Sequence, residues 1–309
     1  MPESSEQGSV LCVDIGGTST KVGIFDCGGQ ARILESIATR GPADSFVDSL
    51  SETLKRARES VDAADVLGIG IAIAGFLNQD RDRMIYNSNL PWLEDYPLRN
   101  HLANELDACV QLEVDSNAAA LAEHHLGVGR GSARFLCLTV GTGLGVGMII
   151  NGEPLRFSYG CLGDAGHIIV QANGPLCTCE GRGCAEIFVS APVLAEKYRV
   201  KSGVQNSLSL RDVIEAARAR DEVAITIIED AGEWLGVATA SLANMFFPED
   251  IAIAGGLAEA GDLLMNSVKR TFDYSASTFA RDRAKLSRAT LGAMATMTGA
   301  AYSILDRKM

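Results

Sequence analysis

Apolar residues gather along the chain in short runs that predict strands in both halves. Residues 10–26 indicate a strand, a Gly-Gly-Thr turn and a second strand, and residues 135–153 repeat this plan around a Gly-Thr turn. Further strands are expected at 66–75, where a continuous apolar run suits burial on both faces, at 109–115 and at 250–256. The repeated hairpin fits two half-molecules of similar design, although any two β-hairpins share these features.

Between these runs, apolar residues recur at helical spacing. This spacing predicts helices at 45–60, about 97–106, 116–127, 210–220, about 221–246 and about 292–305. Ser209 and Asp212 have the spacing of a capping box, and helices are expected to resume only after Ser209. Residues 157–189 form a cysteine- and glycine-rich stretch that indicates loops. Strands that alternate with helices imply an α/β protein whose sheets are covered on both sides.

Length and composition indicate the number of domains, and the net charge indicates which partners are excluded. The 309 residues allow one large domain or two of ordinary size, and a hydrophobic share of 47% supports a sizeable core. There are 27 Lys and Arg against 39 Asp and Glu, so the formal charge is −12. This balance argues against nucleic acid as a partner, because phosphates need a basic face to neutralise them. The 32 glycines predict many tight turns or close backbone approaches.

The N-terminus and the cysteines favour an intracellular location. The first residues are polar and acidic, unlike a secretory signal, and no window reaches the ~18 apolar residues of a membrane span. We therefore expect a cytoplasmic protein without a membrane partner. The eight cysteines of an unexported chain are expected to be thiols or metal ligands rather than disulfides.

Three glycine clusters follow predicted strands, at Asp14–Thr18, Gly141–Gly145 and Ala254–Gly256. Glycine lets main-chain N–H groups approach an anion closely, and threonine adds a hydroxyl donor. Three such turns suit the phosphates and ribose of a nucleotide, and Asp14 is placed to hold Mg²⁺ through water. The P-loop pattern is absent, and a strand follows the GTGLGVG string where a dinucleotide-binding fold needs a helix.

A second cluster predicts a metal site. His167 precedes Cys177, Cys179 and Cys184, and one imidazole with three thiolates makes the closed tetrahedral set of structural zinc. The alternative is a set of loop thiols without an ion.

The glycines of this loop, Gly181 and Gly183, would let the chain fold back so that the last cysteine reaches the same ion. The other thiols are interpreted as small core residues, and Cys161 lies close enough in sequence to compete as a ligand. These thiols are Cys12, Cys27, Cys109, Cys137 and Cys161.

Asp115 is a candidate general base. It ends the strand at 109–115, and a carboxylate at a strand terminus in an α/β crevice can act as a base. From the residue type alone, a helix N-cap is the commoner use of this position. His101, His124 and His125 have no partner pattern and are expected to be exposed helix residues.

Taken together, these strings resemble the ROK family of sugar kinases, within the superfamily of actin, hexokinase and Hsp70. The resemblance runs from about residue 10 to residue 305, through DIGGTSTKVGIFD, GIGIAIAGFL, VDSNAAALAE and LTVGTGLGVGMIINGE. It continues through GCLGDAGHI, CTCEGRGCAE and EDIAIAGGL in the family's order. The combination of the Gly-His and CxC-xxxx-C signature with a DIGGT turn is its most specific part.

The resemblance implies an α/β fold of two actin-like ATPase domains, with mixed sheets flanked by helices and a cleft between them. We expect a small N-terminal domain at 1–120, completed by a C-terminal helix at about 295–309, and a larger domain at 121–294 with the zinc loop. The implied reaction is a glucokinase-like transfer of phosphate from ATP to the 6-hydroxyl of a hexose. Asp115 would be the general base, Mg²⁺ the catalytic ion and Zn²⁺ a structural ion. A homodimer is also implied.

By position, the resemblance assigns residues to three groups. The ATP and phosphate group consists of Asp14, Gly16, Gly17, Thr18, Lys21, Thr142, Gly143, Gly255 and Gly256. The sugar group consists of Gly75, Asp115, Asp164, His167 and Glu186. The metal group consists of His167, Cys177, Cys179 and Cys184. His167 would use one ring nitrogen for zinc and the other for a sugar hydroxyl.

Three positions depart from the family pattern. Val114 stands where the family usually has an Asn that bonds the sugar, and Asp164 stands where it usually has Glu. Glu180 replaces a common glycine of the zinc loop, which predicts a strained turn. Because two of these changes lie at sugar contacts, ATP-dependent phosphorylation is a firmer expectation than glucose as the substrate.

Other functions are kept as alternatives. The first is a kinase for glucosamine, N-acetylglucosamine, N-acetylmannosamine or fructose. A sugar-binding regulator is remoter, because repressors of the family carry an N-terminal helix-turn-helix and the first strand begins near residue 10. A catalytically silent sugar-binding protein is disfavoured by Asp14, Asp115 and the three glycine turns.

Overall fold

The computed structural model describes residues 8–26, 28–61 and 65–306. The chain divides into two compact units. The first comprises the residues up to Ala122, the segment Pro154–Gly163 and the residues from Met294 onward, and the second comprises Glu123–Glu153 and Asp164–Ala293. The segment Pro154–Gly163 was expected in the second domain, but its backbone and side chains bond to the first unit.

Five strands form the sheet of the first unit, in the order β3-β2-β1-β4-β7. β1 (Ser9–Ile15) and β2 (Ser19–Phe25) make the predicted hairpin, and β3 (Ala31–Ala38) extends it antiparallel. β4 (Val66–Ile73) runs parallel to β1, and β7 (Val110–Val114) runs parallel to β4. The first unit therefore has a mixed sheet with its hairpin at one side.

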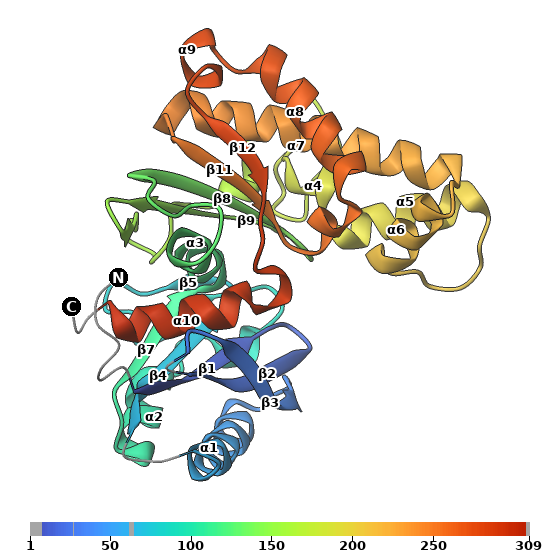
Figure 1. Cartoon of the computed structure of the whole chain (residues 1–309). Coiled ribbons are helices and arrows are strands. Elements are labelled where there is room, and N and C mark those ends of the chain that lie inside the picture. Colours follow the sequence, from blue (N-terminus) through green and yellow to red (C-terminus); the bar gives the residue numbers. More distant parts are fainter. Residues whose placement is uncertain (1–7, 27, 62–64, 307–309) are drawn as a thin grey trace. The chain divides into compact units, whose positions relative to one another are not determined.

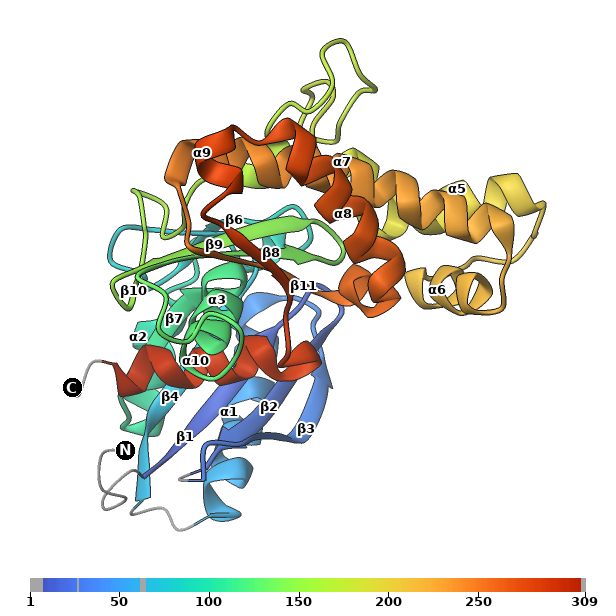
Figure 2. The same ribbon diagram turned by 45° about the horizontal axis from the view of Figure 1, so that its top comes forward.

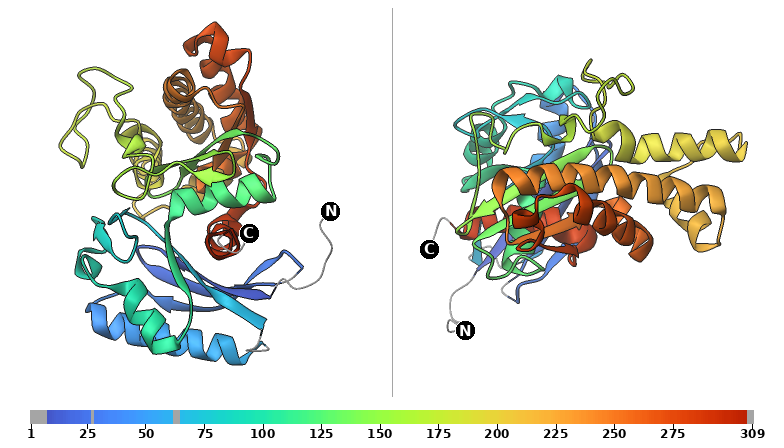
Figure 3. Two further views of the ribbon diagram at one scale, coloured as in Figure 1. Left: turned by 90° about the vertical axis from the view of Figure 1, so that its left-hand side faces the viewer. Right: turned by 90° about the horizontal axis from the view of Figure 1, so that it is seen from above.

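Helices cover both faces of this sheet, as Figures 1 and 3 show. α1 (Ala43–Glu59) and α2 (Leu98–Leu106) lie on one face, and α10 (Ala295–Leu305) lies on the other beside α3 (Asp115–His125). The connection from β4 to α2 contains three short elements: β5 (Phe76–Leu77), β6 (Met84–Tyr86) and the 3₁₀ turn η2 (Pro91–Leu93).

Residues of β4 alternate between large and small because its two faces have different neighbours. Ile69 and Ile71 join the apolar core beneath α1 and α2. Gly70 and Ala72 face α10, and a Cβ on Gly70 would collide with the backbone of Ala300. The small residues let the helix backbone lie directly on the strand, which accounts for part of the glycine enrichment.

The second unit has a sheet with the corresponding strand order, β10-β9-β8-β11-β12. β8 (Arg134–Val140) and β9 (Leu144–Ile150) form its hairpin, and β10 (Glu153–Pro154) pairs at one edge. β11 (Asp250–Ala254) and β12 (Lys285–Arg288) add parallel strands on the other side of β8. Both units thus combine an antiparallel hairpin with parallel strands, as the repeated hairpin predicts.

A pair of long helices, α7 (Glu222–Phe246) and α8 (Asp262–Ser275), packs side by side in the second unit (Figure 2). Its remaining helical elements are η3 (Ala165–His167), α4 (Glu186–Val189), α5 (Ala191–Ser202), α6 (Leu210–Arg218), η4 (Gly256–Ala260), α9 (Thr278–Arg281) and η5 (Gly292–Met294). In the described part of the chain, no helix is long and apolar enough to cross a membrane.

Besides several short elements, the sequence did not predict β3, β12, α5 and α8. β3 and β12 are edge strands with many polar residues, so they lack the apolar run that marks the inner strands. α5 begins just after the glycine-rich loop, well before Ser209. The capping box of α6 is confirmed, because the Ser209 hydroxyl accepts from the Asp212 N–H and the Asp212 carboxylate accepts from the Ser209 N–H.

His101, His124 and His125 lie on helices as expected, but the expectation that they are exposed was wrong. All three are partly buried. The Tyr96 hydroxyl lies 2.9 Å from Nδ1 of His101, and Nε2 of His124 lies 3.0 Å from the carbonyl oxygen of Ser132. Polar partners from neighbouring loops hold these rings, and a single sequence does not reveal such pairs.

Candidate functional site

Two aspartates lie at one edge of the first sheet. β1, β4 and β7 run parallel, so their carboxyl ends lie at the same edge. Asp14 is near the end of β1, and Asp115 directly follows β7 as the first residue of α3. The negative charge of Asp14 makes a small contribution to the raised pKa of Asp115.

The side chain of Asp115 is half-buried. This burial raises its pKa to about 6, and the neighbouring charge of Asp14 adds to the effect. The N–H of Ser116 donates to Oδ1 at 2.7 Å and works against the rise. That bond comes from the next residue, whereas an N-cap accepts from the second or third residue of the helix. No cation forms an ion pair with Asp115 among the described residues, so no neighbouring positive charge stabilises its carboxylate anion.

Asp14 differs because it has a cationic neighbour across the hairpin. Lys21 is its register partner on β2, with Nζ 3.4 Å from Oδ2. Burial raises the pKa of Asp14, and Lys21 opposes that rise. The turn between the two strands is tied by a bond from the Gly16 N–H to the Ser19 carbonyl, and it leaves Gly17 and Thr18 exposed. The first glycine turn therefore presents main-chain groups beside a carboxylate and an ammonium.

In the second unit, a carboxylate supports the corresponding turn. Oε2 of Glu186 accepts the Leu144 N–H at 3.0 Å, and a Cβ on Gly143 would run into the same oxygen. Thr142, at the tip of this turn, is exposed. Glu186 was predicted as a sugar contact and Gly143 as a phosphate contact, and the structure brings these two residues together.

The third glycine turn follows β11. Gly255 has a φ of 87°, and a Cβ there would collide with the backbone of Val140 at the end of β8. Gly256 has open space by comparison, with Leu210 as its nearest neighbour at 3.7 Å. Packing therefore requires glycine only at position 255, where the turn lies directly against the end of β8.

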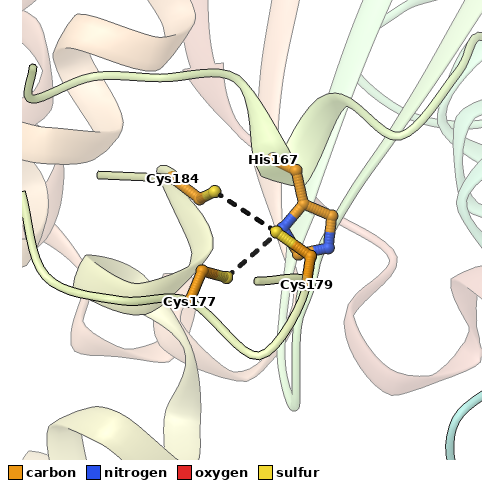
Figure 4. Close-up of side chains that lie close together, drawn as sticks. All are labelled: His167, Cys177, Cys179 and Cys184. Carbon is orange, nitrogen blue, oxygen red and sulfur yellow. Dashed lines mark hydrogen bonds between the residues drawn. The ribbon is translucent and has the colours of Figure 1, made fainter. Parts of the chain in front are cut away.

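The predicted metal ligands converge on one point (Figure 4). The ligand atoms of His167, Cys177, Cys179 and Cys184 all lie within 4.8 Å of one another. Sγ of Cys177 is 3.5 Å from Nδ1 of His167, and the sulfurs of Cys179 and Cys184 are 3.6 Å apart. Four ligands about 2.3 Å from one zinc ion would be spaced by about 3.8 Å, so the donor set fits tetrahedral zinc.

The backbone of the loop explains how these ligands meet. The loop projects from the rest of the second unit in Figure 2, where it is yellow-green. Gly183 has a φ of 73°, and a Cβ there would collide with the Gln171 carbonyl. A Cβ on Gly181 would lie 3.3 Å from the Cys179 sulfur and crowd the cluster. Glu180 has a φ of 68°, which is the strained turn that the sequence predicts.

The other ring nitrogen of His167 faces a different neighbour. Nε2 lies 3.6 Å from Oδ2 of Asp164, which is exposed. His167 thus joins the cysteine cluster through Nδ1 and leaves Nε2 beside a predicted sugar contact. In the first unit, Gly75 has a φ of 104°, and a Cβ there would collide with the Tyr86 carbonyl.

The remaining cysteines partly match the expectation of core residues. Cys12, Cys137 and Cys161 are buried, whereas Cys109 is exposed. Cys161 packs in the core of the first unit and is not one of the four converging ligands. Cys27 lies outside the described residues.

Sequence reasoning did not single out Glu113, which is completely buried on β7 beside Asp115. Arg81 and Arg156 both pair with its carboxylate. A signal was available, because Glu113 is the only charged residue in the apolar run from 109 to 114. Its two partners lie 32 and 43 residues away in the chain, and no local pattern indicates them.

Comparison with known proteins gives consistent matches over nearly the whole chain. The ROK family profile matches residues 10–307. A glucokinase of Halalkalibacterium halodurans is 32% identical over 315 residues, which is 96% of this chain and 94% of that protein.

Solved structures agree with this match. A ROK family glucokinase from Streptomyces griseus, in complex with glucose and AMPPNP, has a TM-score of 0.85 and 29% identity, covering 96% of this chain and 99% of its own. A ROK hexokinase from Thermus thermophilus has a TM-score of 0.77 and 31% identity, covering 97% and 99%. The fold and these matches define the class of actin-like sugar kinases. The chain belongs to the ROK family, and it is an ATP-dependent sugar kinase.

Relief of the strained turn gives a stability prediction. Glu180→Gly is expected to raise the free energy of unfolding by about 1 kcal/mol, because glycine adopts the left-handed backbone without a clash of its Cβ. Thermal unfolding would show a higher Tm than the wild type.

Arg182→Gly is the matched control for this prediction. Arg182 is an exposed residue of the same loop and has no positive φ, so glycine there should only add backbone freedom and lower the Tm. A Tm of Glu180→Gly at or below that of the wild type would show that the turn is not strained.

Proposed function

We propose that the protein transfers the γ-phosphate of ATP to the 6-hydroxyl of a hexose, with glucose as the first candidate. The observation that carries this proposal is Asp115, a half-buried carboxylate without a cationic partner among the described residues, at the sheet edge that also carries Asp14. The similarity to a Streptomyces griseus glucokinase in complex with glucose and AMPPNP supports the choice of donor and acceptor.

Asp115 would act as the general base. A pKa of about 6 leaves the carboxylate ionised at neutral pH and still basic enough to accept a proton. It would remove the proton of the 6-hydroxyl while that oxygen bonds to the γ-phosphorus and the bond from phosphorus to the ADP oxygen breaks. A positioned base of this kind contributes about 10²–10⁴-fold in rate.

The phosphate chain would be held by the three glycine turns. The first turn, with Gly16, Gly17 and Thr18, would face the transferring phosphate, and Lys21 would lie beside it. The second turn, with Thr142 and Gly143, would hold the other phosphates. The third turn, with Gly255 and Gly256, would lie against the nucleoside. Exposed N–H and hydroxyl groups in these turns suit this role. Asp14 offers an oxygen donor of the type that Mg²⁺ prefers, and the ion would neutralise charge on the phosphates.

The sugar would contact Gly75, Asp115, Asp164, His167 and Glu186. Zinc bound by His167 and the three cysteines would brace the histidine, so that its Nε2 is held beside Asp164. Because Val114 and Asp164 depart from the family pattern at sugar contacts, they do not fix which sugar accepts the phosphate. The alternative acceptor is an amino hexose, an N-acetyl hexose or fructose. A homodimer stays a prediction from the family resemblance.

A coupled ADP-release assay over hexoses, amino hexoses, N-acetyl hexoses and fructose tests the proposal. We expect ATP-dependent turnover with at least one of these sugars. The 6-deoxy analogue of the best substrate is the matched control, since it keeps every other hydroxyl and should bind without turnover. ATP binding without turnover on any sugar would contradict the kinase assignment, and turnover of the 6-deoxy analogue would contradict the 6-hydroxyl.

Removal of the base has two expected consequences. Asp115→Asn should lower kcat by about 10²–10⁴-fold and leave the affinity for ATP unchanged. For the wild type, kcat should fall as the pH drops through about 6, because Asp115 is then protonated. A kcat of Asp115→Asn near that of the wild type would show that Asp115 is not the base.

The same substitution should stabilise the fold. A carboxyl whose pKa is raised by folding destabilises the protein once it is ionised, so the cost is absent below about pH 4 and complete above about pH 6. Because Asp115 is only partly shielded at its surface, we expect about 1–2 kcal/mol. Chemical unfolding should therefore show Asp115→Asn to be more stable than the wild type at pH 7.5 and equally stable at pH 4.

The metal assignment predicts about one zinc ion per chain by elemental analysis. Cys179→Ser should lose the metal, lower the Tm and raise KM for the sugar more than KM for ATP, because the brace on His167 is lost. Cys109→Ser is the control, since Cys109 is an exposed thiol outside the cluster. Wild-type protein without zinc, or equal zinc in both variants, would refute the site.

A further inference from the structure

Glu113 is a buried carboxylate with an unusually complete set of partners. It lies on β7, two residues before Asp115, and is fully shielded from solvent. Its Oε2 accepts from Arg81 Nη1 at 2.9 Å and from Arg156 Nε at 3.1 Å. Arg81 comes from the turn between β5 and β6, and Arg156 from the segment Pro154–Gly163. Three separate stretches of the first unit therefore meet at one carboxylate.

The other oxygen of Glu113 is turned toward the start of α3. Oε1 accepts the Val114 N–H at 3.1 Å and the side-chain amide of Asn117 at 2.8 Å. The same amide nitrogen donates to the carbonyl oxygen of Gly160 at 2.8 Å. Both acceptors require the nitrogen of Asn117 at this point, so the orientation of the amide is determined. Glu113 and Asn117 are thus bonded directly to each other across Asp115.

The side chain of Asp115 has few polar contacts among the described residues. Its carboxylate receives a hydrogen bond from Ser116, and among the described residues no cation pairs with it. The placement of its side chain is consequently set by the backbone of residues 113–117. The bond between Glu113 and Asn117 closes that stretch of backbone into a ring.

We infer that Glu113, acting through Asn117, is a positioning residue that holds Asp115 in place for proton transfer. This inference rests on the proposed function. The arginines hold the Glu113 carboxylate in one orientation and balance its charge, and Asn117 passes that orientation to the first turn of α3. A displacement of about 1 Å can cost a catalytic group about 10²-fold in rate, so a small loosening is measurable.

In a purely structural role, Glu113 would instead only stabilise the fold by linking three chain segments. The two roles are separable because Oε2 takes the short bonds from both arginines, whereas Oε1 takes the bond from Asn117 and a longer one, at 3.5 Å, from Arg156 Nε. Asn117→Ala removes the bond across Asp115 and leaves both arginine pairs intact, so the variant should fold. Gln111→Ala is the matched control: Gln111 is buried on the same strand and face, and within the described part of the chain its amide has one polar contact, at 3.9 Å from the Cys109 sulfur.

For Asn117→Ala we expect kcat to fall about 10–100-fold, with KM and Kd for ATP within about twofold of the wild type. Gln111→Ala should keep kcat. Glu113→Gln should lower kcat in the same way as Asn117→Ala, because the carboxylate that the arginines orient is lost. In an Asp115→Asn background, Asn117→Ala should cause no further loss, since there is no base left to position.

Two results would overturn the inference. One is an unchanged kcat of Asn117→Ala, and the other is an equal loss of residual rate in the Asp115→Asn background, which would indicate general damage. If the wild type phosphorylates no sugar, the proposed function fails, and hydrogen exchange then decides the positioning role. Faster exchange of the amides of residues 115–117 in Asn117→Ala, but not in Gln111→Ala, supports it, and equal exchange refutes it.

Discussion

The end of β7 carries two carboxylates two residues apart, and the structure treats them in opposite ways. Glu113 is fully buried and receives two arginines. Asp115 is half-buried, and no cation pairs with it among the described residues. Burial of an ionised carboxylate without a partner lowers the stability of the fold, and carboxylates with raised pKa values are frequent at functional sites. Both carboxylates lie where β7 ends and α3 begins, so their positions depend on how these two elements pack.

Small residues make that edge possible. Gly70 and Ala72 on β4 let the backbone of α10 lie against the sheet, and Gly299 of α10 does the same for α3, where a Cβ would collide with Ala118. α3 is therefore packed closely beside α10, and its first residue is Asp115. In the second unit, glycines have a comparable role. Gly181 and Gly183 let four ligands converge, and Gly143 makes room for Glu186.

Much of the fold and the ligand set could be predicted from the sequence because the signals are local. The apolar run of β4, the Gly-Thr hairpins and the cysteine spacing around His167 each lie within a short stretch. The polar edge strand β12 and the contacts of Glu113 could not be predicted, since they depend on segments far apart in the chain. The rise in the pKa of Asp115 belongs to the same class, because burial is a property of the assembled unit.

Burial without an opposing cation would prepare Asp115 to accept a proton from a sugar hydroxyl. Carbon-13 NMR titration of the aspartate carboxyl groups tests it most directly, with the Asp115 signal assigned by its absence in Asp115→Asn. We expect this carboxyl to titrate at about pH 6, well above an ordinary aspartate. A titration near pH 4 would contradict it, because it would show a solvated or paired carboxylate with no special readiness to take up a proton.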